Sequence, residues 1–448
     1  MRNLQQWTIL LMSAGALALP AVANAGSFQL NEQSASSLGR ANAGDASANL
    51  DASAVFYNPA LLTALSKGDF LVGATDYKIR GEFSKTSATD AAGQPLTGDN
   101  GGDMGDHNRL GAGVTPILSF ATPIARHTVF GVALETPFGL TTGYDGTSVL
   151  RYQAQYTSIS VNNINPTIAY QVSNDFSIGF GLDVAKAEAK LTNQIDYGAV
   201  CYANVNPLAC NAAGLYPQSH DGFYKVAGSD WGYGWNAGVA WRHDGTSIGL
   251  TYRSRLFFNI NGNVEFKNVP TLFQASKAFA DAGAQAKLNL PDTVDLSATQ
   301  AIGSAWKVSA TVRYVRWSTF HSLIIRYDSP NTQGSSTQTF DYRNTWFVGL
   351  GADYRLSSSW TLHGGVAYDQ SPVRDQYREP RLPDTNRRWV AFGATWTLAP
   401  SSSVSVGWAH LFMNDHSPMN NTGPSGSTVK GQWSTNADLF SLQYQYSF

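Results

Sequence analysis

Large apolar side chains occupy every second position in the last nine residues of the chain. The apolar set is Phe440, Leu442, Tyr444, Tyr446 and Phe448, and the residues between them are Ser441, Gln443, Gln445 and Ser447. A strand with this alternation places one apolar face and one polar face on opposite sides of a sheet. The pattern predicts a strand of an outer-membrane barrel, with lipid outside and water or ligand inside.

The same alternation recurs beyond about residue 68, and charged residues in these segments fall mostly on the polar face, where their burial costs least. Short turns alternate with long polar connections, as in bacterial barrels. The expected turns lie at 173–175, 243–245, 302–305, 357–359 and 400–403, and the expected long connections at 81–108, 138–150, 197–228, 263–288, 328–340, 371–386 and 415–431. The segments between them predict about 14 antiparallel strands, an even number as closure requires.

The first 25 residues follow a different pattern. They contain Arg2, an apolar stretch from Ile9 to Ala23, and a step of small residues that ends at Ala25. This is typical of a secretory signal peptide over residues 1–25, so we expect the mature chain to begin at Gly26. The alternative is an uncleaved anchor helix, but the apolar stretch is shorter than the ~20 residues that span hydrocarbon.

Residues 26–67 lack the strand alternation and are rich in Ala, Ser, Asn and Asp. Gly39, Gly44 and Pro59 interrupt the segment, which predicts short helices broken by loops. Its apolar members favour a position inside the barrel, and they are Phe28, Leu30, Leu38, Val55 and Phe56. We therefore predict an all-β fold, with a transmembrane barrel over 68–448 and a small helical hatch over 26–67 that plugs its lumen.

Composition excludes some classes of protein. The 448 residues are 43% hydrophobic and 14% charged, and the net charge is -2. This balance excludes the strongly basic surface of a nucleic-acid-binding protein. No apolar run is long enough for a membrane helix, while one large barrel accommodates the whole length.

Cys201 and Cys210 are the two cysteines of the chain, and they lie nine positions apart in a turn-rich stretch. In an exported chain this spacing favours a disulfide that pins a loop. The alternative is a metal site, which would need further ligands, and His220 is the one nearby. We expect a disulfide, no metal and no cofactor.

Several short segments resemble the long-chain fatty acid transporter (FadL) family of outer-membrane proteins, and the resemblance covers nearly the whole mature chain. The matching segments are Gly26-Ser27-Phe28-Gln29-Leu30-Asn31-Glu32, Leu38-Gly39-Arg40-Ala41, Asn58-Pro59-Ala60, Leu290-Pro291-Asp292, Trp317-Ser318, Gly365-Val366-Ala367-Tyr368-Asp369-Gln370-Ser371-Pro372-Val373 and Leu382-Pro383-Asp384. Asn-Pro-Ala also occurs in aquaporins, but those need two copies and several apolar helices.

The resemblance implies a 14-stranded barrel with an N-terminal hatch that takes up hydrophobic molecules. In the family, ligand is caught among extracellular loops, passes to an apolar pocket, and leaves sideways through a gap at a kink in the third strand. The expected partners are a hydrophobic ligand, outer-membrane lipid and the barrel assembly machinery, and the expected state is a monomer in the bacterial outer membrane. Lateral release keeps apolar ligand surface out of water, worth ~0.8 kcal/mol per CH₂.

By the same resemblance, Gly139 matches the disrupted position of the third strand, and Pro137 beside it removes a ladder donor. The alternative is an ordinary strand end that enters a loop. Asn58, ahead of Pro59 and Ala60, is expected either to place an amide of the hatch beside this gap or to cap a turn.

For the ligand, we expect apolar contacts from Phe28, Leu30 and Phe138. The loop near 263–288 adds an apolar face at roughly helical spacing, which consists of Val269, Leu272, Phe273 and Phe279. This face is expected to pack on a neighbouring loop, to form the landing groove for the ligand, or both.

A carboxylate ligand would also require a cation, and Lys190 and Arg326 lie near the regions where the family supplies basic residues. The match is incomplete, because Asn193 and Ile324 stand where a well-known fatty-acid member has basic residues. The departure leaves room for neutral hydrocarbons, as in the aromatic-uptake branch of the family.

Outer-membrane lipases and proteases are barrels too, but the chain has no Gly-x-Ser-x-Gly elbow and no His-Glu-x-x-His motif. We therefore expect no enzyme activity. A general diffusion porin is opposed by the hatch sequence.

Overall fold

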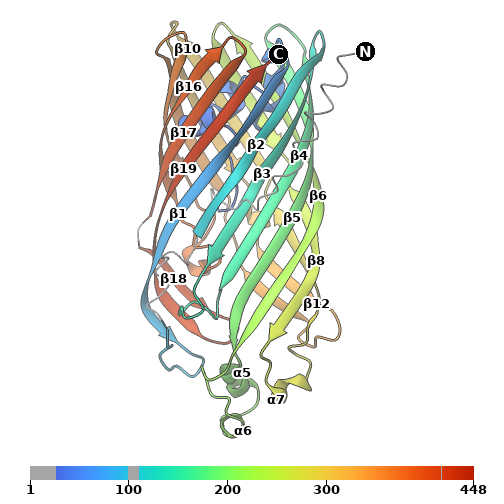
Figure 1. The fold of residues 1–448 in the computed structure, drawn as a ribbon, viewed down its shortest axis with the longest axis vertical. Coiled ribbons are helices and arrows are strands. Elements are labelled where there is room, and N and C mark those ends of the chain that lie inside the picture. Colours follow the sequence, from blue (N-terminus) through green and yellow to red (C-terminus); the bar gives the residue numbers. More distant parts are fainter. Residues whose placement is uncertain (1–26, 99–109, 415) are drawn as a thin grey trace.

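The computed structural model describes residues 27–98, 110–414 and 416–448. The expected signal peptide, residues 1–25, lies outside the described residues. Within the described part, fourteen antiparallel strands form a closed barrel, which confirms the predicted fold class (Figure 1). The barrel closes where the last strand pairs with the first, from Asp69 opposite Ser447 to Thr89 opposite Thr428.

Nine of the described strands cross as single segments, and five are each broken into two. The unbroken strands are β1 (Asp69–Thr89), β2 (Leu110–Ala125), β3 (Thr128–Gly143), β4 (Tyr156–Gln171), β5 (Phe176–Asp196), β6 (Asp221–His243), β15 (Trp360–Asp369), β16 (Arg387–Ala399) and β19 (Thr428–Ser447). The broken strands are β7 (Thr246–Arg253) with β8 (Leu256–Lys267), β9 (Ala282–Leu290) with β10 (Thr293–Ile302), β11 (Trp306–Val315) with β12 (Ser322–Tyr327), β13 (Ser335–Thr339) with β14 (Thr345–Arg355), and β17 (Ser402–Met413) with β18 (Ser417–Thr422).

The alternation in the last strand divides its side chains between lipid and lumen as predicted. Leu442 is 58% exposed on the outer face, whereas the next residue, Gln443, is 2% exposed on the inner face. The same division holds along β8, β10 and most of β5. Among the described residues, no helix has the length and apolar character of a membrane span.

The two ends of the barrel differ as predicted, with the short turns at one end and the long connections at the other, which we call the loop end (Figure 1). The long connections are shorter than the sequence suggested. Strand β6 already begins at Asp221, and β9 at Ala282, inside stretches that we expected to be loops. Near the loop end polar residues occupy the outer face as well, for example Asn259 and Asn261 of β8, so polarity alone does not mark a strand end there.

Two of the long connections contain helices. Helices α5 (Tyr197–Asn204) and α6 (Pro207–Ala212) follow β5, and α7 (Thr271–Gln274) follows β8. Asp196 caps α5 by accepting from the Ala199 amide at 2.9 Å, and Asn206 caps α6 by accepting from the Ala209 amide at 2.8 Å.

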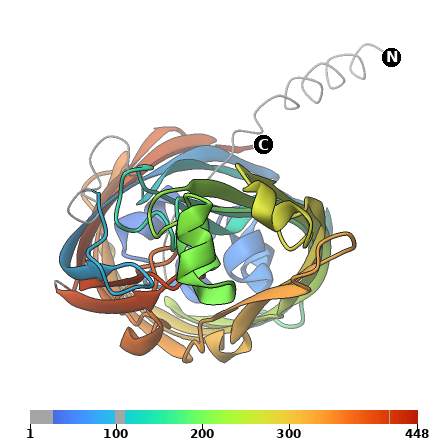
Figure 2. The ribbon, with the colours of Figure 1, turned by 90° about the horizontal axis from the view of Figure 1, so that it is seen from below.

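The N-terminal segment lies inside the barrel, as Figure 2 shows along the barrel axis. It contains α2 (Ala35–Gly39), α3 (Asp45–Ala48), α4 (Ala54–Tyr57) and the 3₁₀ helix η1 (Pro59–Ala64), and we call 27–64 the hatch segment. These short helices pack on strands around the barrel, including β10, β17 and β5. The boundaries predicted at residues 67 and 68 remain a prediction.

The inner wall receives the hatch segment through glycines and buried ion pairs. A Cβ at Gly365 of β15 would meet the Arg40 carbonyl oxygen, and one at Gly249 of β7 would meet the Ala46 carbonyl oxygen. The Arg313 guanidinium of β11 lies 2.8 Å from Asp295 and 2.5 Å from Asp45 of the hatch segment. The two backbones can approach this closely only because glycine has no side chain, and each buried charge is stabilised by its oppositely charged partner.

We predict that Gly365→Val destabilises the docked hatch segment by about 1–3 kcal/mol, because the added side chain overpacks the contact with Arg40. The matched control is Gly364→Val, whose Cβ meets nothing closer than 4.0 Å, at Phe392. The temperature at which heat-modifiable gel migration changes should fall for Gly365→Val and stay unchanged for Gly364→Val. Equal temperatures for both variants would show that close backbone approach does not hold the segment.

Candidate functional site

A cavity of about 630 Å³ lies at the loop end, between the barrel wall, helices α5 and α7, and the connection between β15 and β16. We call residues 370–386 the inner connection. The apolar part of the cavity is lined by Phe28, Leu140, Ile159, Leu191, Phe266, Leu272, Phe273, Phe279, Phe320, Leu323, Ile325 and Phe340. A smaller hollow of about 50 Å³ shares Ile159, Leu191 and Phe320 and is lined further by Ile260 and Leu288. The cavity therefore has an apolar extension along the lumen.

The polar part of the cavity is built around Arg381 of the inner connection. Its guanidinium donates to Thr157 Oγ1 at 3.1 Å, to the Thr192 carbonyl oxygen at 3.2 Å and to Asn193 Oδ1 at 3.0 Å. The Tyr144 hydroxyl donates to the Pro380 carbonyl oxygen at 2.6 Å and so holds the inner connection in place. The Arg381 cation thus lies at the polar end of a cavity whose other part is apolar.

Glu379 lines the same cavity and is 3% exposed. Burial raises the pKa of its carboxyl to about 7, against the lowering effect of Arg381. Burial also lowers the pKa of the Arg381 guanidinium, which Glu379 partly offsets. An arginine stays protonated at neutral pH, so the cavity keeps its positive charge.

Four of the predicted ligand residues meet at this cavity: Phe28, Leu272, Phe273 and Phe279. The loop near 263–288 packs on its neighbour as expected, since Phe273 and Phe279 contact Tyr197 of α5. Leu272, Phe273 and Phe279 also line the cavity, whereas Val269 does not, and the role of this face as a landing groove stays a prediction. Phe138 lies behind Phe28, with ring centroids 5.9 Å apart. Leu30 does not reach the cavity and packs with Leu38 against the wall.

Lys190 and Arg326 do not meet the cavity, in contrast to the prediction. Both side chains are exposed on the outer face of the barrel, and Lys190 Nζ lies 5.2 Å from the centre of the Tyr156 ring. The cause is the strand period of two: Leu191 and Ile325, their direct neighbours, point inward. Arg381 was missed because it lies in a connection, where no alternation indicates direction.

The ladder of β3 is interrupted where the sequence suggested. Pairing with β2 ends at Leu134, and the register with β4 shifts between Glu135 and Phe138, while the strand continues to Gly143. Residues 135–143 are buried throughout, so this part of β3 no longer alternates between lipid and lumen.

The hatch segment takes over the hydrogen bonds that β2 leaves. The Gly139 amide donates to the Phe28 carbonyl oxygen, and the Leu30 amide donates to the Pro137 carbonyl oxygen, each at 2.8 Å. The Phe28 ring lies 5.0 Å from Trp317 and 5.7 Å from Phe320, between the cavity and the interrupted ladder. A short backbone segment therefore covers the inner side of the break.

Asn58 combines a turn cap with a contact to the wall. Its Oδ1 accepts from the Ala60 amide at 3.1 Å, and its Nδ2 donates to the carbonyl oxygens of Ala46 at 2.8 Å and Val239 of β6 at 3.1 Å. The amide thus bonds to β6 and not to the break in β3. Pro59 lines a second hollow of about 50 Å³ together with Pro137 and Phe138, while Ala60 packs in an apolar cluster with the wall.

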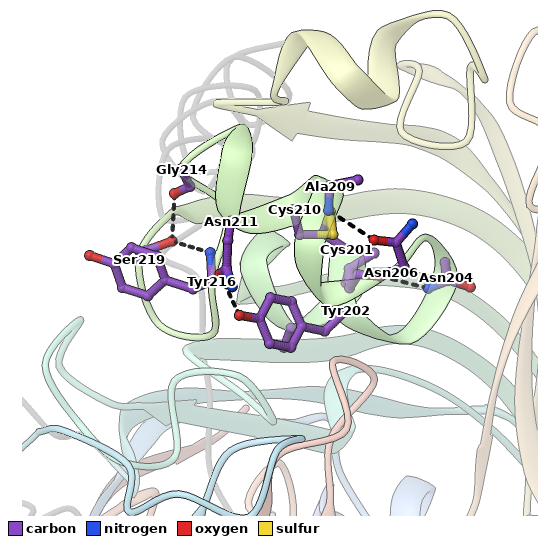
Figure 3. Close-up of a disulfide and its surroundings, with 12 residues drawn as sticks. Cys201, Tyr202, Asn204, Asn206, Ala209, Cys210, Asn211, Gly214, Tyr216 and Ser219 are labelled. Atoms are coloured by element: carbon purple, nitrogen blue, oxygen red, sulfur yellow. Dashed lines mark hydrogen bonds between the residues drawn. A yellow bond between two sulfur atoms is a disulfide. The ribbon is translucent and has the colours of Figure 1, made fainter.

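The lobe formed by α5 and α6 is pinned by the predicted disulfide between Cys201 and Cys210, whose side chains are buried (Figure 3). The Tyr202 hydroxyl donates to Asn211 Oδ1 at 2.5 Å across the two helices. Val200 and Asn204 of α5 line the cavity. The disulfide therefore supports one wall of the site.

Residues 16–448 match the family model described as outer membrane protein transport protein (OMPP1/FadL/TodX). The long-chain fatty acid transport protein of Escherichia coli strain K12 is 28% identical over 99% of this chain and 100% of its own length. Two solved structures share the fold. A Pseudomonas aeruginosa FadL homologue has a TM-score of 0.85 and 22% identity over 94% of this chain and 100% of its own. The toluene transporter TodX of P. putida has a TM-score of 0.70 and 17% identity over 92% and 98%.

We predict that Cys201→Ala combined with Cys210→Ala lowers the free energy of unfolding of the lobe by about 2–3 kcal/mol, because the disulfide restricts the unfolded state of this short loop. Limited proteolysis should cut between residues 197 and 216 faster than in the unmodified protein, while the barrel keeps its heat-modifiable migration. Equal cleavage rates would mean that packing alone holds the lobe.

Proposed function

The chain belongs to the outer membrane protein transport protein family (OMPP1/FadL/TodX) and is an outer-membrane uptake barrel for hydrophobic molecules, and we propose that its ligand is a long-chain fatty acid. The observation that carries the proposal is the cavity that joins an apolar wall to the Arg381 guanidinium. The family consists of transporters and not of enzymes. The identity of the ligand and its route are our inference.

The acyl chain would lie along the apolar wall and its carboxylate would meet Arg381. Each buried CH₂ contributes ~0.8 kcal/mol, and the small hollow continues the apolar surface beyond Phe320. Charge-assisted hydrogen bonds from a guanidinium suit a carboxylate. Since three acceptors already orient the Arg381 side chain, it loses little conformational entropy when the ligand binds.

Capture would begin at the lobe and α7. Leu272 is 46% exposed and also lines the cavity, so one side chain faces both solvent and site. Leu208 at the start of α6 is 85% exposed. An exposed apolar surface beside a cavity favours the landing of an apolar ligand.

Release would occur sideways, at the interrupted ladder of β3. Phe28 separates the cavity from this break, and two backbone hydrogen bonds hold its segment there. Displacing Phe28 would connect the cavity to lipid, and an apolar chain loses least by that route. The hatch segment, buried across the lumen, opposes passage straight through.

A neutral aromatic hydrocarbon is the second candidate. Asn193 and Ile324 stand where basic residues occur in a fatty-acid member of the family, and Ile324 is exposed on the outer face. TodX is a toluene transporter by name. The two candidates differ in whether affinity depends on Arg381.

We further propose a monomer inserted by the barrel assembly machinery. The support is physical: β1 and β19 close the ring, so the described barrel has no free strand edge that a second copy would need to cover.

We predict that Arg381→Gln weakens the binding of an ionised fatty acid about tenfold to a hundredfold, because a charge-assisted hydrogen bond is lost. Tryptophan fluorescence or calorimetry with detergent-solubilised protein measures the affinity. Arg326→Gln is the matched control, since it removes an arginine from the outer face and should change nothing. Unchanged fatty-acid affinity in Arg381→Gln, with toluene bound by both proteins, would favour the hydrocarbon.

We predict that a disulfide between cysteines placed at Gln29 and Phe138 stops uptake and spares binding. These residues are directly opposed in an antiparallel bridge, so the geometry suits a disulfide that fixes the Phe28 segment over the break. Uptake of a radiolabelled fatty acid by cells should fall after oxidation and return after reduction. The single-cysteine variants and the unmodified protein, treated alike, control for the native disulfide. Undiminished uptake in the oxidised double variant would exclude exit at this place.

A further inference from the structure

Glu379 is a buried carboxylate that forms no ion pair among the described residues, although the charge and the backbone amide of Arg381 both act to lower its pKa. It is 3% exposed, it lines the cavity, and its Oε1 has no hydrogen-bond partner among the described residues. No described cation lies within ion-pair distance of it. A buried carboxylate costs free energy unless it is paired, so its retention beside a binding cavity calls for a role.

The charged and titratable groups around Glu379 come from three connections. Arg381 of the inner connection lowers the pKa of Glu379. Glu379 in turn helps to raise the pKa of the Tyr144 hydroxyl in the β3–β4 connection and of the Tyr342 hydroxyl between β13 and β14. Burial raises the pKa of both tyrosines, so they stay neutral in the physiological range. One positive and one negative group therefore determine the charge of this end of the cavity.

A fatty acid carboxylate at Arg381 would bring a second carboxylate to this end. Two carboxylates that share a small buried site do not both ionise, because the repulsion raises the pKa of the pair until one proton is held. The positive charge of Arg381 balances the single remaining negative charge. The site is then neutral overall, as a cavity with apolar walls requires.

We infer that the bound acid and Glu379 share one proton, and that Glu379 passes this proton to the ligand before it leaves for the membrane. The inference rests on the proposed function. The O–H bond of protonated Glu379 breaks and an O–H bond forms on the ligand carboxylate. The neutral acid departs, and Glu379, left as a carboxylate, regains a proton from water or buffer acid of the medium.

The proton transfer removes a physical obstacle to lateral release. The way to the break in β3 passes Phe28, Phe138 and Trp317, which form one aromatic cluster. An ionised carboxylate pays a large desolvation cost in such surroundings, and a neutral carboxyl group pays far less. Glu379 would thus convert the ligand into the form that crosses an apolar gap.

The test is the pH dependence of decanoate affinity, measured by calorimetry with the full-length protein in detergent between pH 7 and 9. Free decanoate is ionised throughout this range, while unliganded Glu379, with a pKa of about 7, loses its proton as pH rises. Since the complex retains the proton, the dissociation constant should rise about tenfold per pH unit. Titration in two buffers of different ionisation enthalpy should show about one proton taken up per ligand at pH 8.

Glu379→Gln should remove both the pH dependence and the proton uptake, and at pH 9 it should bind decanoate more tightly than the unmodified protein. Asp375→Asn is the matched control, because it removes an exposed carboxylate from the same connection outside the cavity. It should keep the full pH dependence. Decanol, which carries no charge, should bind equally at every pH.

A decanoate affinity that stays constant from pH 7 to 9 in the unmodified protein would overturn the shared proton and leave the proposed function standing. A slope that persists in Glu379→Gln, with folding verified by heat-modifiable migration, would overturn the assignment to Glu379. Failure to bind decanoate at any pH would overturn the proposed function itself, and this inference with it.

Discussion

A strand in a lipid-embedded barrel gives every second side chain to the membrane, so whatever the wall contributes to the site and its support must come from the remaining half. The inner face meets this constraint with two different surfaces at two heights. Towards the turn end it carries glycines and charged residues such as Gly365, Gly249 and Arg313, which receive the hatch segment. Towards the loop end it carries Leu191 and Ile325, which line the cavity. The aromatic cluster around Phe28 lies where the two surfaces meet.

The strength of the contacts explains which part of the hatch segment is fixed. Asp45 and Arg40 pair with Arg313 and Asp353 of the wall, and breaking such buried pairs costs about 3–5 kcal/mol. The segment around Phe28 has backbone hydrogen bonds to β3 and aromatic contacts, but no ion pair among the described residues holds it. A change confined to the first residues therefore needs far less free energy than undocking the helices.

The sequence predicted the features that follow from short-range patterns. Alternation indicated the barrel, the apolar residues of 26–67 indicated a segment inside it, and the cysteine spacing indicated the disulfide. It failed for Lys190 and Arg326, because proximity in sequence to an expected site does not fix which face a strand residue takes. It also failed for Arg381 and Glu379, since the inner connection folds back over the lumen through contacts with distant residues such as Tyr144 and Thr192.

The inner connection links the polar end of the cavity to the start of the hatch segment. Asp384 accepts from the Ser27 amide at 3.2 Å and from the Ser371 hydroxyl at 2.5 Å, and it pairs with Arg387 of β16. Arg381 lies three residues earlier on the same connection. A ligand that draws Arg381 toward its carboxylate therefore acts on a segment that also holds Ser27, next to Phe28. Under the proposed function, binding of the head group and release at the break in β3 would thus be connected through one short stretch of backbone.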